Sequence, residues 1–244
     1  MLDATTHSPT WQMPVSHHSH KQSMIERLSE ASYPMIKRGV DSAISGMVLV
    51  LLSPLLLAIA IAIKLDSPGP VIYVQRRGGL HGRIFNFYKF RSMTNGRDHT
   101  QEHRKFAEAY INGDTPAHQL EETGRPIYKP MSNGHSVTHV GRWLRRTSLD
   151  ELPQLVNILK GDMSLVGPRP SIDYEVAMYT EQQYQRLVVI PGLTGWAQIN
   201  GRSSLSFDEI VRFDIEYIAQ RSLRKDLAIL WATIPMVVKA QDAG

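Results

Sequence analysis

A long uncharged segment near the N-terminus constrains this chain more than any other feature of its sequence. Residues 42–63 read SAISGMVLVLLSPLLLAIAIAI and contain no charged side chain. A helix of this length can span the hydrocarbon core of a bilayer. Ser53 and Pro54 lie at its midpoint, where Pro54 removes the hydrogen bond to the Val50 carbonyl and the Ser53 hydroxyl can satisfy a freed carbonyl. The segment is therefore predicted to be a helix with a break in its middle.

The charges around this segment do not place its ends on opposite sides of a membrane. Lys37 and Arg38 precede it and Lys64 follows it, so basic residues flank both ends. Its position in the chain and the lack of a small-residue cleavage site argue against an ordinary secretory signal. We predict a re-entrant membrane helix over residues 35–65, broken at Ser53-Pro54, and a kinked single span is the alternative.

The segments on either side of this helix differ in composition. Residues 1–34 begin with a polar stretch that has no apolar periodicity, and we predict a flexible tail. Its closely spaced histidines could bind a metal only if a fixed geometry and a further ligand were supplied from elsewhere. With 42% hydrophobic and 20% charged residues, the chain can bury one core of ordinary size. Residues 66–244 are predicted to form that single domain.

Short strands are predicted directly after the apolar segment. VIYVQRR at 71–77 and RIFNFYKFRSM at 83–93 flank the sequence GGLHG, which is typical of a glycine-rich hairpin turn. The two-residue period places Lys89 and Arg91 on one face of the second strand, together with two phenylalanines. These two cations either face solvent or face an anion.

The rest of the chain adds helices to this hairpin. Residues 94–135 are polar and irregular, and we expect a variable insertion with one amphipathic helix near 101–111. Apolar periodicity predicts further helices at 207–221 and 222–240, and the second is apolar enough either to lie at a membrane interface or to be buried. The expected fold is therefore a mixed α/β domain with interfacial amphipathic helices.

Composition excludes several kinds of site. The chain has no cysteine, which rules out disulfides, thiolate zinc sites and a cysteine nucleophile. Its 27 basic and 23 acidic residues give a net charge of +4, which suits phosphate ligands or an anionic membrane surface without identifying either. Because the cations are scattered and no recognition helix is apparent, we expect no nucleic acid partner.

An acidic pair stands within the segment RRTSLDELPQLVNILKGDMSLVGPRP, residues 145–170. Ser148 and Glu151 have the spacing of a capping box, and the apolar stripe that follows predicts a helix ending at Gly161. Asp150 and Glu151 would then open this helix. Capping alone explains such a pair, because the helix macrodipole favours carboxylates at the N-terminus.

The surroundings of the pair indicate phosphate chemistry as well. Arg145 precedes it, and Arg169 follows between two prolines that fix the backbone around a single guanidinium, an arrangement that suits bidentate binding of phosphate. Adjacent carboxylates also suit Mg²⁺, which takes one or two carboxylates together with phosphate oxygens and water. Asp150 and Glu151 are therefore the candidate metal ligands. A second glycine-rich segment, 191–202, reads as a shaped loop that either holds a nucleotide or packs against the core.

Taken together, these motifs resemble the bacterial sugar transferase family, the monotopic phosphoglycosyl transferases that begin exopolysaccharide and O-antigen assembly. The resemblance runs through LLSPLLL, KLDSPGPVIYVQRR, FYKFRSM, SLDELPQLVNILKGDMSLVGPRP and PGLTGWAQINGR. It implies a protein of the bacterial inner membrane with its catalytic domain on the cytoplasmic face. It further implies transfer of a sugar-1-phosphate from a UDP-sugar to polyprenyl phosphate with release of UMP, in a two-step reaction that uses Mg²⁺.

The resemblance also assigns roles to individual residues. Asp150 would be the nucleophile that attacks the β-phosphate and forms a phosphosugar intermediate. Glu151 would help to bind Mg²⁺ or activate the incoming phosphate, while Lys89 and Arg169 would hold phosphate oxygens. Three further residues match family positions that we assign to the substrate phosphates: Arg145, Arg202 and Asp226. The expected partners are a UDP-sugar, polyprenyl phosphate and membrane lipid, and the resemblance leaves a homodimer open.

One departure and two alternatives qualify this expectation. Ile190 stands where the family usually has a basic residue, which places one phosphate or headgroup contact in doubt. An inactive scaffold of a polysaccharide export complex would not need Asp150, Glu151, Lys89 and Arg169. A glycosyltransferase that moves the sugar without its phosphate would be expected to show a Rossmann-like alternation with a glycine-rich first turn, which is not apparent here. The sequence does not identify the sugar.

Overall fold

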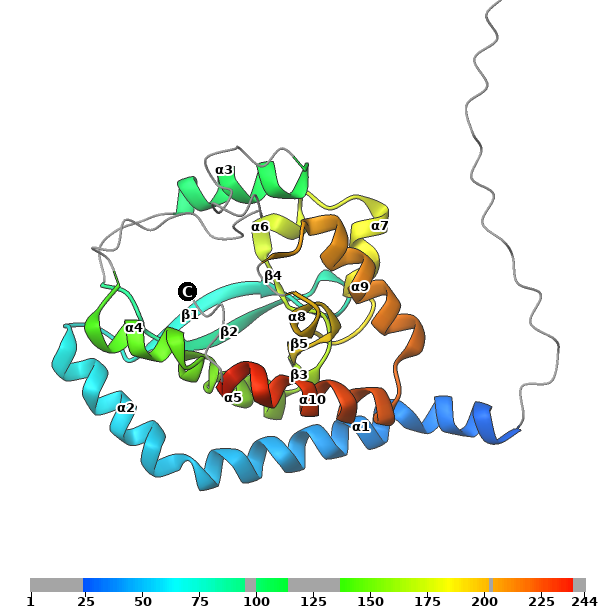
Figure 1. Ribbon diagram of the computed structural model, residues 1–244, viewed down its shortest axis with the longest axis horizontal. Coiled ribbons are helices and arrows are strands. Elements are labelled where there is room, and N and C mark those ends of the chain that lie inside the picture. Colours follow the sequence, from blue (N-terminus) through cyan, green and yellow to red (C-terminus); the bar gives the residue numbers. More distant parts are fainter. Residues whose placement is uncertain (1–23, 95–99, 114–136, 202–203, 239–244) are drawn as a thin grey trace, which may run out of the picture.

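The computed structural model describes residues 24–94, 100–113, 137–201 and 204–238, and it shows the expected mixed α/β fold (Figure 1). Most of the expected tail, much of the expected insertion and Arg202 lie outside these residues.

The two N-terminal helices form a bent pair. Helix α1 spans Met24–Leu51 and α2 spans Ser53–Asp66, with an angle of 63° between the parts on either side of the break. Pro54 falls in the first turn of α2, where its missing N–H leaves no helical hydrogen bond unmade. The Ser53 hydroxyl donates to the Val50 carbonyl at 2.8 Å. The predicted break at Ser53-Pro54 is confirmed.

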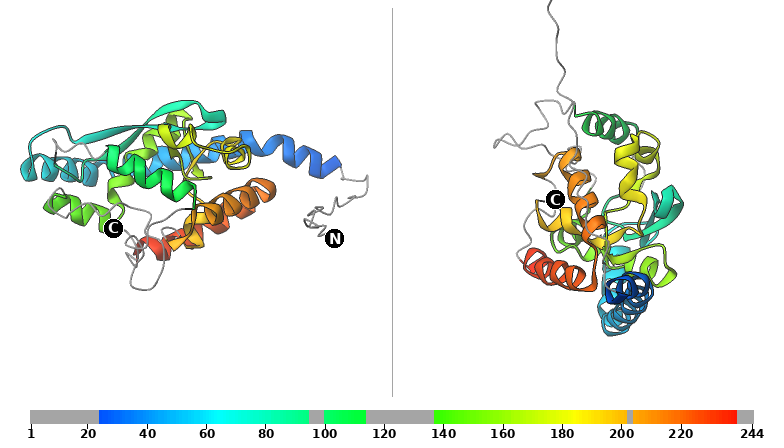
Figure 2. Two further views of the ribbon diagram at one scale, coloured as in Figure 1. Left: turned by 90° about the horizontal axis from the view of Figure 1, so that it is seen from above. Right: turned by 90° about the vertical axis from the view of Figure 1, so that its right-hand side faces the viewer.

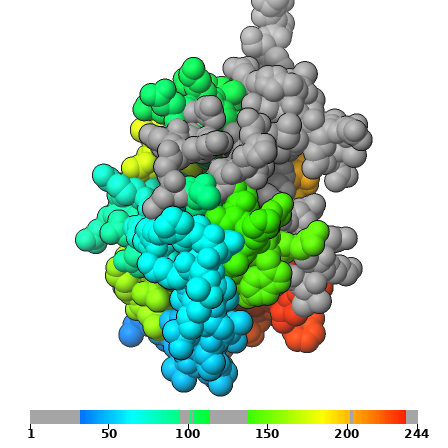
Figure 3. Space-filling view, turned by 90° about the vertical axis from the view of Figure 1, so that its left-hand side faces the viewer, coloured from blue at the N-terminus to red at the C-terminus, as the bar shows by residue number. Residues whose placement is uncertain are grey.

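The bent pair exposes a large apolar surface. Among the described residues no single helix is long and apolar enough to cross a membrane, whereas Ser32–Leu51 and Ser53–Asp66 reach that length and composition together. The large apolar side chains of the pair that are at least half exposed are Met35, Met47, Val50, Leu51, Leu57, Ile61 and Leu65. Extended patches of this kind mark membrane or protein contacts. Figure 3 shows α2 in cyan at the lower edge of the molecule.

The predicted hairpin is present and forms a sheet with a third, very short strand. Strand β1 (Ile72–Gly78) pairs antiparallel with β2 (Ile84–Phe90), and β4 (Ser171–Ile172) pairs with the other edge of β1. The strand order is β2-β1-β4. The hairpin turn contains the 3-10 turn η1 (Leu80–Gly82), in which Gly82 has a φ of 75°, so the glycine-rich turn chemistry is confirmed.

The remaining elements surround this sheet. Their bounds in chain order are α3 (Thr100–Ile111), α4 (His139–Arg146), η3 (Leu149–Glu151), α5 (Gln154–Lys160), β3 (Ser164–Val166), α6 (Asp173–Val176), α7 (Glu181–Tyr184), η4 (Gln185–Leu187), β5 (Gly192–Thr194), α8 (Trp196–Ile199), α9 (Phe207–Gln220) and α10 (Leu223–Val238). The helices predicted near 101–111, 207–221 and 222–240 are thus confirmed. Strands β3 and β5 form a separate two-stranded parallel sheet.

The glycine-rich segment 191–202 contains regular structure rather than the loop that we expected. Strand β5 and helix α8 lie within it, and its glycines let two backbones approach. A Cβ atom on Gly192 would lie 2.1 Å from the Gly167 nitrogen, and one on Gly195 would lie 2.2 Å from the Gly167 oxygen. The glycines therefore serve close packing between β5 and the loop after β3, one of the two uses considered from sequence.

Helix α5 packs into the main core and bonds to strand β2. Leu155 and Ile158 are buried in the main core, whereas Val156 and Leu159 of the predicted stripe are 40% exposed. The buried Asn157 side chain bonds to β2, donating to the Asn86 carbonyl at 2.6 Å. The helix ends at Gly161, with a φ of 88°, as predicted.

Helix α10 lies on the same side of the molecule as the bent pair. Figure 1 and the right view of Figure 2 show α10 in red and α1 in blue, both on the lower side of the molecule. Leu227, Trp231 and Ile234 on this helix are 61%, 78% and 55% exposed, while Ile229 is fully buried. The apolar surface of the bent pair is thereby extended by the C-terminal helix.

Candidate active site

The acidic pair lies on the 3-10 turn η3 rather than inside a helix. Ser148 adopts the left-handed conformation with a φ of 55°, and its side chain caps no backbone group. Helix α5 begins only at Gln154. The predicted capping box is therefore wrong, and the physical reason is competition: the Glu151 carboxylate is bound by cations from two other parts of the chain.

These cations reach Glu151 from β2 and from the loop between β3 and β4. Lys89 Nζ donates to Glu151 Oε1 at 3.1 Å, and Arg169 Nη2 donates to the same oxygen at 2.9 Å. Lys89 Nζ lies 3.8 Å from Asp150 Oδ2. The structure thus brings together four of the residues predicted from sequence. One oxygen of Glu151 is bound by two cations, whereas Asp150 has a single, longer contact with Lys89.

Burial and charge act differently on the two carboxyl groups. Burial raises the pKa of Asp150 above its usual range, although the ammonium group of Lys89 partly opposes this shift. Burial would also raise the pKa of Glu151, but the charges of Arg169 and then Lys89 outweigh it and hold that pKa well below its usual range. Glu151 is accordingly a firmly ionised anchor, and Asp150 is a buried carboxyl whose charge is less well compensated.

The same environment shifts the pKa of Lys89. Burial of its ammonium group lowers its pKa, while the Glu151 and Asp150 carboxylates act in the opposite direction. Its ammonium group also lies 5.7 Å from the centre of the Phe87 ring. Phe87 is 1% exposed, so the strand face that carries Lys89 is anchored in the core.

Arg91 does not accompany Lys89 as the strand periodicity suggested. Strand β2 ends at Phe90, and the Arg91 side chain, 4% exposed, turns to the connection between α2 and β1. It donates to the Ser67 carbonyl at 2.6 Å and to the Pro68 carbonyl at 2.9 Å. Arg91 therefore ties the end of the bent pair to the sheet and lies outside the acidic site.

The two remaining described candidates lie in different places. Arg145 is in the last turn of α4, and its charge lowers the pKa of Asp150, in part offsetting the effect of burial. Asp226 instead binds to α1: its Oδ2 accepts from Lys37 at 2.8 Å and from Tyr33 at 2.9 Å. Its other oxygen accepts from the Tyr217 hydroxyl at 2.7 Å. These hydrogen bonds join Asp226 to α1 and α9 rather than to the acidic pair.

The two carboxylates fit a magnesium site that the protein shares with the substrate phosphates, rather than one built from protein ligands alone. Within the described residues no three or more His, Cys, Asp or Glu side chains form a metal-binding group. Asp150 and Glu151 supply two carboxylates, and the hydrogen bonds from Lys89 and Arg169 described above both go to Oε1 of Glu151. Mg²⁺ that arrives with a diphosphate needs no more than one or two carboxylates.

Several residues that shape this site were not found from sequence. Arg77 donates to the Pro170 carbonyl at 2.6 Å, and Arg186 donates to the Arg169 carbonyl at 3.2 Å. Arg38, considered only as a flanking charge, donates to the Ile158 and Leu159 carbonyls at the end of α5. The sequence around these three arginines has no motif that sets them apart from other basic residues.

The comparisons with known proteins agree with this architecture. The profile of the bacterial sugar transferase family matches residues 32–240, and the chain belongs to that family. The match includes the bent pair, the hairpin, the acidic turn and α10.

Individual relatives support the same assignment. The chain is 39% identical over 216 residues to an undecaprenyl-phosphate galactose phosphotransferase of Salmonella typhimurium, covering 88% of this chain and 43% of the relative. It is 38% identical over 213 residues to a UDP-glucose:undecaprenyl-phosphate glucose-1-phosphate transferase of Escherichia coli, covering 82% and 39%. The chain thus spans less than half the length of these two relatives. It is also 41% identical over 203 residues to the exopolysaccharide production protein ExoY of Rhizobium meliloti, covering 83% and 85%.

Proposed function

We propose that this protein transfers a sugar-1-phosphate from a UDP-sugar to undecaprenyl phosphate, releasing UMP, and so begins exopolysaccharide assembly. The observation on which this rests is the acidic pair, buried Asp150 and partly buried Glu151, held by Lys89 and Arg169. The activities named for the Salmonella and Escherichia relatives support the choice of substrates. The sugar itself is left open.

In the proposed reaction Asp150 is the nucleophile. A carboxylate oxygen of Asp150 forms a bond to the β-phosphorus, the bond from that phosphorus to the bridging oxygen breaks, and UMP leaves with the bridging oxygen. An oxygen of undecaprenyl phosphate then attacks the same phosphorus and releases the Asp150 carboxylate. The looser hold on Asp150, 3.8 Å from Lys89 against 3.1 Å for Glu151, supports this division of roles.

The cations neutralise the diphosphate that an anionic nucleophile must approach. Lys89 and Arg169 are both fixed by Glu151 before any substrate arrives, so little reorganisation is needed when phosphate oxygens bind. Mg²⁺ held by Asp150 and Glu151 would add further charge neutralisation on the phosphate oxygens. Arg145 would supply additional positive charge near Asp150.

The bent pair places this site next to the lipid substrate. We propose that residues 35–65 enter and leave the cytoplasmic leaflet on the same face, and that residues 66–244 form the catalytic domain against that face. The exposed apolar residues of α1, α2 and α10 support this arrangement. Both the soluble donor and the lipid phosphate would then reach Asp150 from one side.

The experiment that tests the activity is a panel of UDP-sugars assayed with undecaprenyl phosphate and Mg²⁺. We expect at least one sugar to give UMP in amounts equal to the lipid-linked product. Release of UDP would indicate transfer of the sugar without its phosphate, and no product with any sugar would favour an inactive scaffold. Either result would refute the proposal.

Membrane topology can be tested separately because the chain has no native cysteine. Single cysteines placed at residues 40 and 64 would be labelled in intact cells with a membrane-impermeant reagent. Protection of both positions until the cells are opened is expected. Labelling of only one of them from outside would show a spanning helix.

A further inference from the structure

A buried charge pair, Arg186 and Asp214, contacts the backbone of Arg169. Arg186 in η4 is 4% exposed and Asp214 in α9 is 1% exposed, and Arg186 Nη2 lies 2.7 Å from Asp214 Oδ2. The Arg186 guanidinium also lies over the rings of Phe207 and Tyr179, at 5.6 Å and 5.9 Å from their centres. Burying two charges in this way is costly, so a hydrophobic pair would serve stability as well.

The Arg186 guanidinium contacts the backbone and side chains around Arg169. Its Nη2 donates to the Arg169 carbonyl at 3.2 Å, and its Nη1 donates to the Ser171 hydroxyl at 3.3 Å and to the Tyr179 hydroxyl at 3.1 Å. Tyr179 in turn donates to Ser171 at 2.5 Å. Arg186 thus holds the chain on both sides of Pro170.

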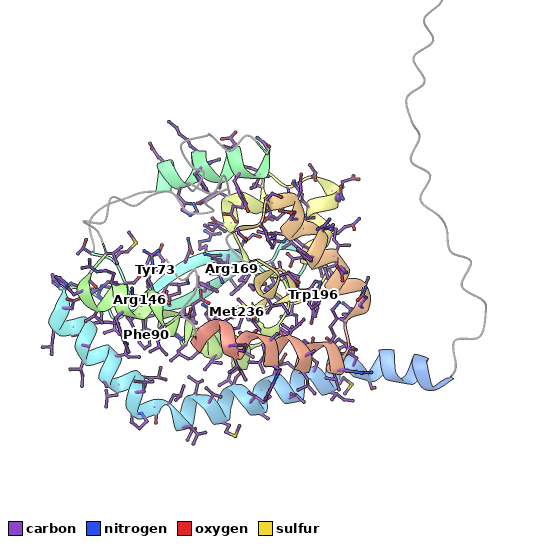
Figure 4. The ribbon with its side chains drawn as sticks, in the orientation of Figure 1. Tyr73, Phe90, Arg146, Arg169, Trp196 and Met236 are labelled. Atoms are coloured by element: carbon purple, nitrogen blue, oxygen red, sulfur yellow. The ribbon has the colours of Figure 1, made fainter. Side chains whose placement is uncertain are left out.

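A second arginine restrains the same segment from the sheet. Arg77 Nη1 donates to the Pro170 carbonyl at 2.6 Å, and its guanidinium lies 4.7 Å from the centre of the Phe87 ring. Residues 169–171 are therefore bound by both arginines, and the prolines at 168 and 170 restrict the φ angles of this segment. Figure 4 labels Arg169 near the strands and Trp196 on α8.

The position of the Arg169 backbone affects the acidic pair, because the Arg169 side chain bonds to Glu151. Arg169 Nη2 lies 2.9 Å from Glu151 Oε1, and Lys89 bonds to that same oxygen. A displacement of the Arg169 backbone would move its guanidinium relative to both groups. A misplacement of about 1 Å can reduce turnover by about 100-fold.

We propose that Arg186, held in place by Asp214, is a positioning residue that fixes the backbone of Arg169 and thereby the geometry of the phosphate site. This inference rests on the proposed function, in which Arg169 binds the substrate phosphates. Arg186 acts through Arg169, whose backbone carbonyl accepts its hydrogen bond.

A double-mutant cycle separates positioning from a purely structural role. The variants are Arg186→Met, Arg169→Lys and the combination, assayed for kcat and KM with the UDP-sugar that the wild-type enzyme uses. We expect Arg186→Met to lower kcat/KM by about 10-fold or more in the wild-type background, as for other residues that support a catalytic group. In the Arg169→Lys background, Arg186→Met should lower kcat/KM by less than about 3-fold, because the residue that Arg186 positions is already altered.

Equal losses in the two backgrounds would overturn the proposal, because additive effects indicate independent roles. Arg212→Met is the matched control, since Arg212 is an exposed arginine on α9, and it should leave kcat/KM unchanged. If Arg186→Met does not fold, Tyr179→Phe replaces it in the cycle, and the same non-additivity is expected. A wild-type enzyme inactive with every UDP-sugar would refute the proposed function and this inference with it, whereas an active enzyme with additive losses would refute only the inference.

Discussion

The cluster around Asp150 and Glu151 and the cluster around Asp226 both combine acidic and basic groups, and the difference between them separates a candidate reactive site from a structural joint. In the first, Asp150 has one cation at 3.8 Å, while Glu151 binds Lys89 and Arg169. In the second, both oxygens of Asp226 accept hydrogen bonds, from Tyr33, Lys37 and Tyr217. A carboxylate whose oxygens are already bonded has little capacity left for a substrate.

The second cluster joins helix α1 of the bent pair to the rest of the fold. Tyr33 and Lys37 belong to α1, Tyr217 to α9 and Asp226 to α10. Tyr217 also donates to the Val166 carbonyl at 3.2 Å, which extends the joint to β3. Burial is common to both clusters, so what distinguishes them is how completely each carboxylate is satisfied.

The same substitution in each cluster should give opposite results, and the effect at Asp150 should be the largest. Asp150→Asn removes the nucleophile, and we expect turnover to fall by at least about 10³-fold. Burial raises the pKa of Asp150, so the folded state disfavours its charged form, and the contribution of Asp150 to stability falls as pH rises through that pKa. The variant should therefore be at least as stable as the wild type at pH 7, as measured by thermal unfolding.

Asp226→Asn is the counterpart of that variant. It removes charge-assisted hydrogen bonds to three groups, and we expect a loss of roughly 2 kcal/mol in the free energy of unfolding. Turnover per folded molecule should stay within about 3-fold of the wild type, inside the context-dependent spread of such effects. A large loss of turnover at unchanged stability would instead support the role at the substrate phosphates that the family resemblance implies for Asp226.

Lys89 should have the next largest effect, because it contacts both members of the acidic pair. Lys89→Met keeps the length of the side chain and removes its charge, and we expect kcat/KM to fall roughly 100-fold, as for loss of one preorganised donor. Lys160→Met is the control, since Lys160 is an exposed lysine that pairs with Asp162. A Lys89 variant with wild-type kcat/KM would remove Lys89 from the site.

The dependence of kcat/KM on pH should report the ionisation of the Asp150 carboxyl group. Attack requires the ionised carboxylate, so activity should fall as pH decreases through the folded pKa of Asp150. Burial raises that pKa, and the acid limb of kcat/KM should therefore lie above the ordinary aspartate value of 3.8. Because Lys89 lowers this pKa, residual activity of Lys89→Met should show an acid limb at still higher pH. A limb that moved to lower pH would contradict the assigned electrostatics.

The smallest predicted effect concerns the joint. Tyr217→Phe removes a hydroxyl that bonds to Asp226 and Val166, and we expect a loss of about 1 kcal/mol in stability without a change in kcat/KM. Urea unfolding and the UMP assay would measure the two quantities. Reduced turnover in a fully folded Tyr217 variant would show that the two clusters are coupled.

Local sequence signals predicted the local structure well. The break at Ser53-Pro54, the hairpin turn at Gly82 and the helix end at Gly161 each depend on backbone chemistry within a few residues. The structure also brings together Lys89, Asp150, Glu151 and Arg169, which the family resemblance assigned to one site, and their roles there stay predictions.

Contacts between distant segments could not be predicted in the same way. The spacing of Ser148 and Glu151 indicates a capping box, but Lys89, 62 residues away, and Arg169 compete successfully for the carboxylate. Arg91 follows the strand period, yet β2 ends before it and its side chain binds the Ser67 and Pro68 carbonyls. The Arg186-Asp214 pair has no local pattern at all, since only the packing of η4 against α9 brings it together.

The central claim is that Asp150 forms a covalent phosphosugar intermediate, and a single measurement tests it directly. Enzyme mixed with its UDP-sugar and Mg²⁺, without lipid acceptor, should release about one UMP per active site, and rapid digestion followed by mass spectrometry should find the sugar-phosphate on the peptide that contains Asp150. Addition of undecaprenyl phosphate should then remove it. A burst that persists in Asp150→Asn, or a sugar-phosphate found on another residue, would contradict the account.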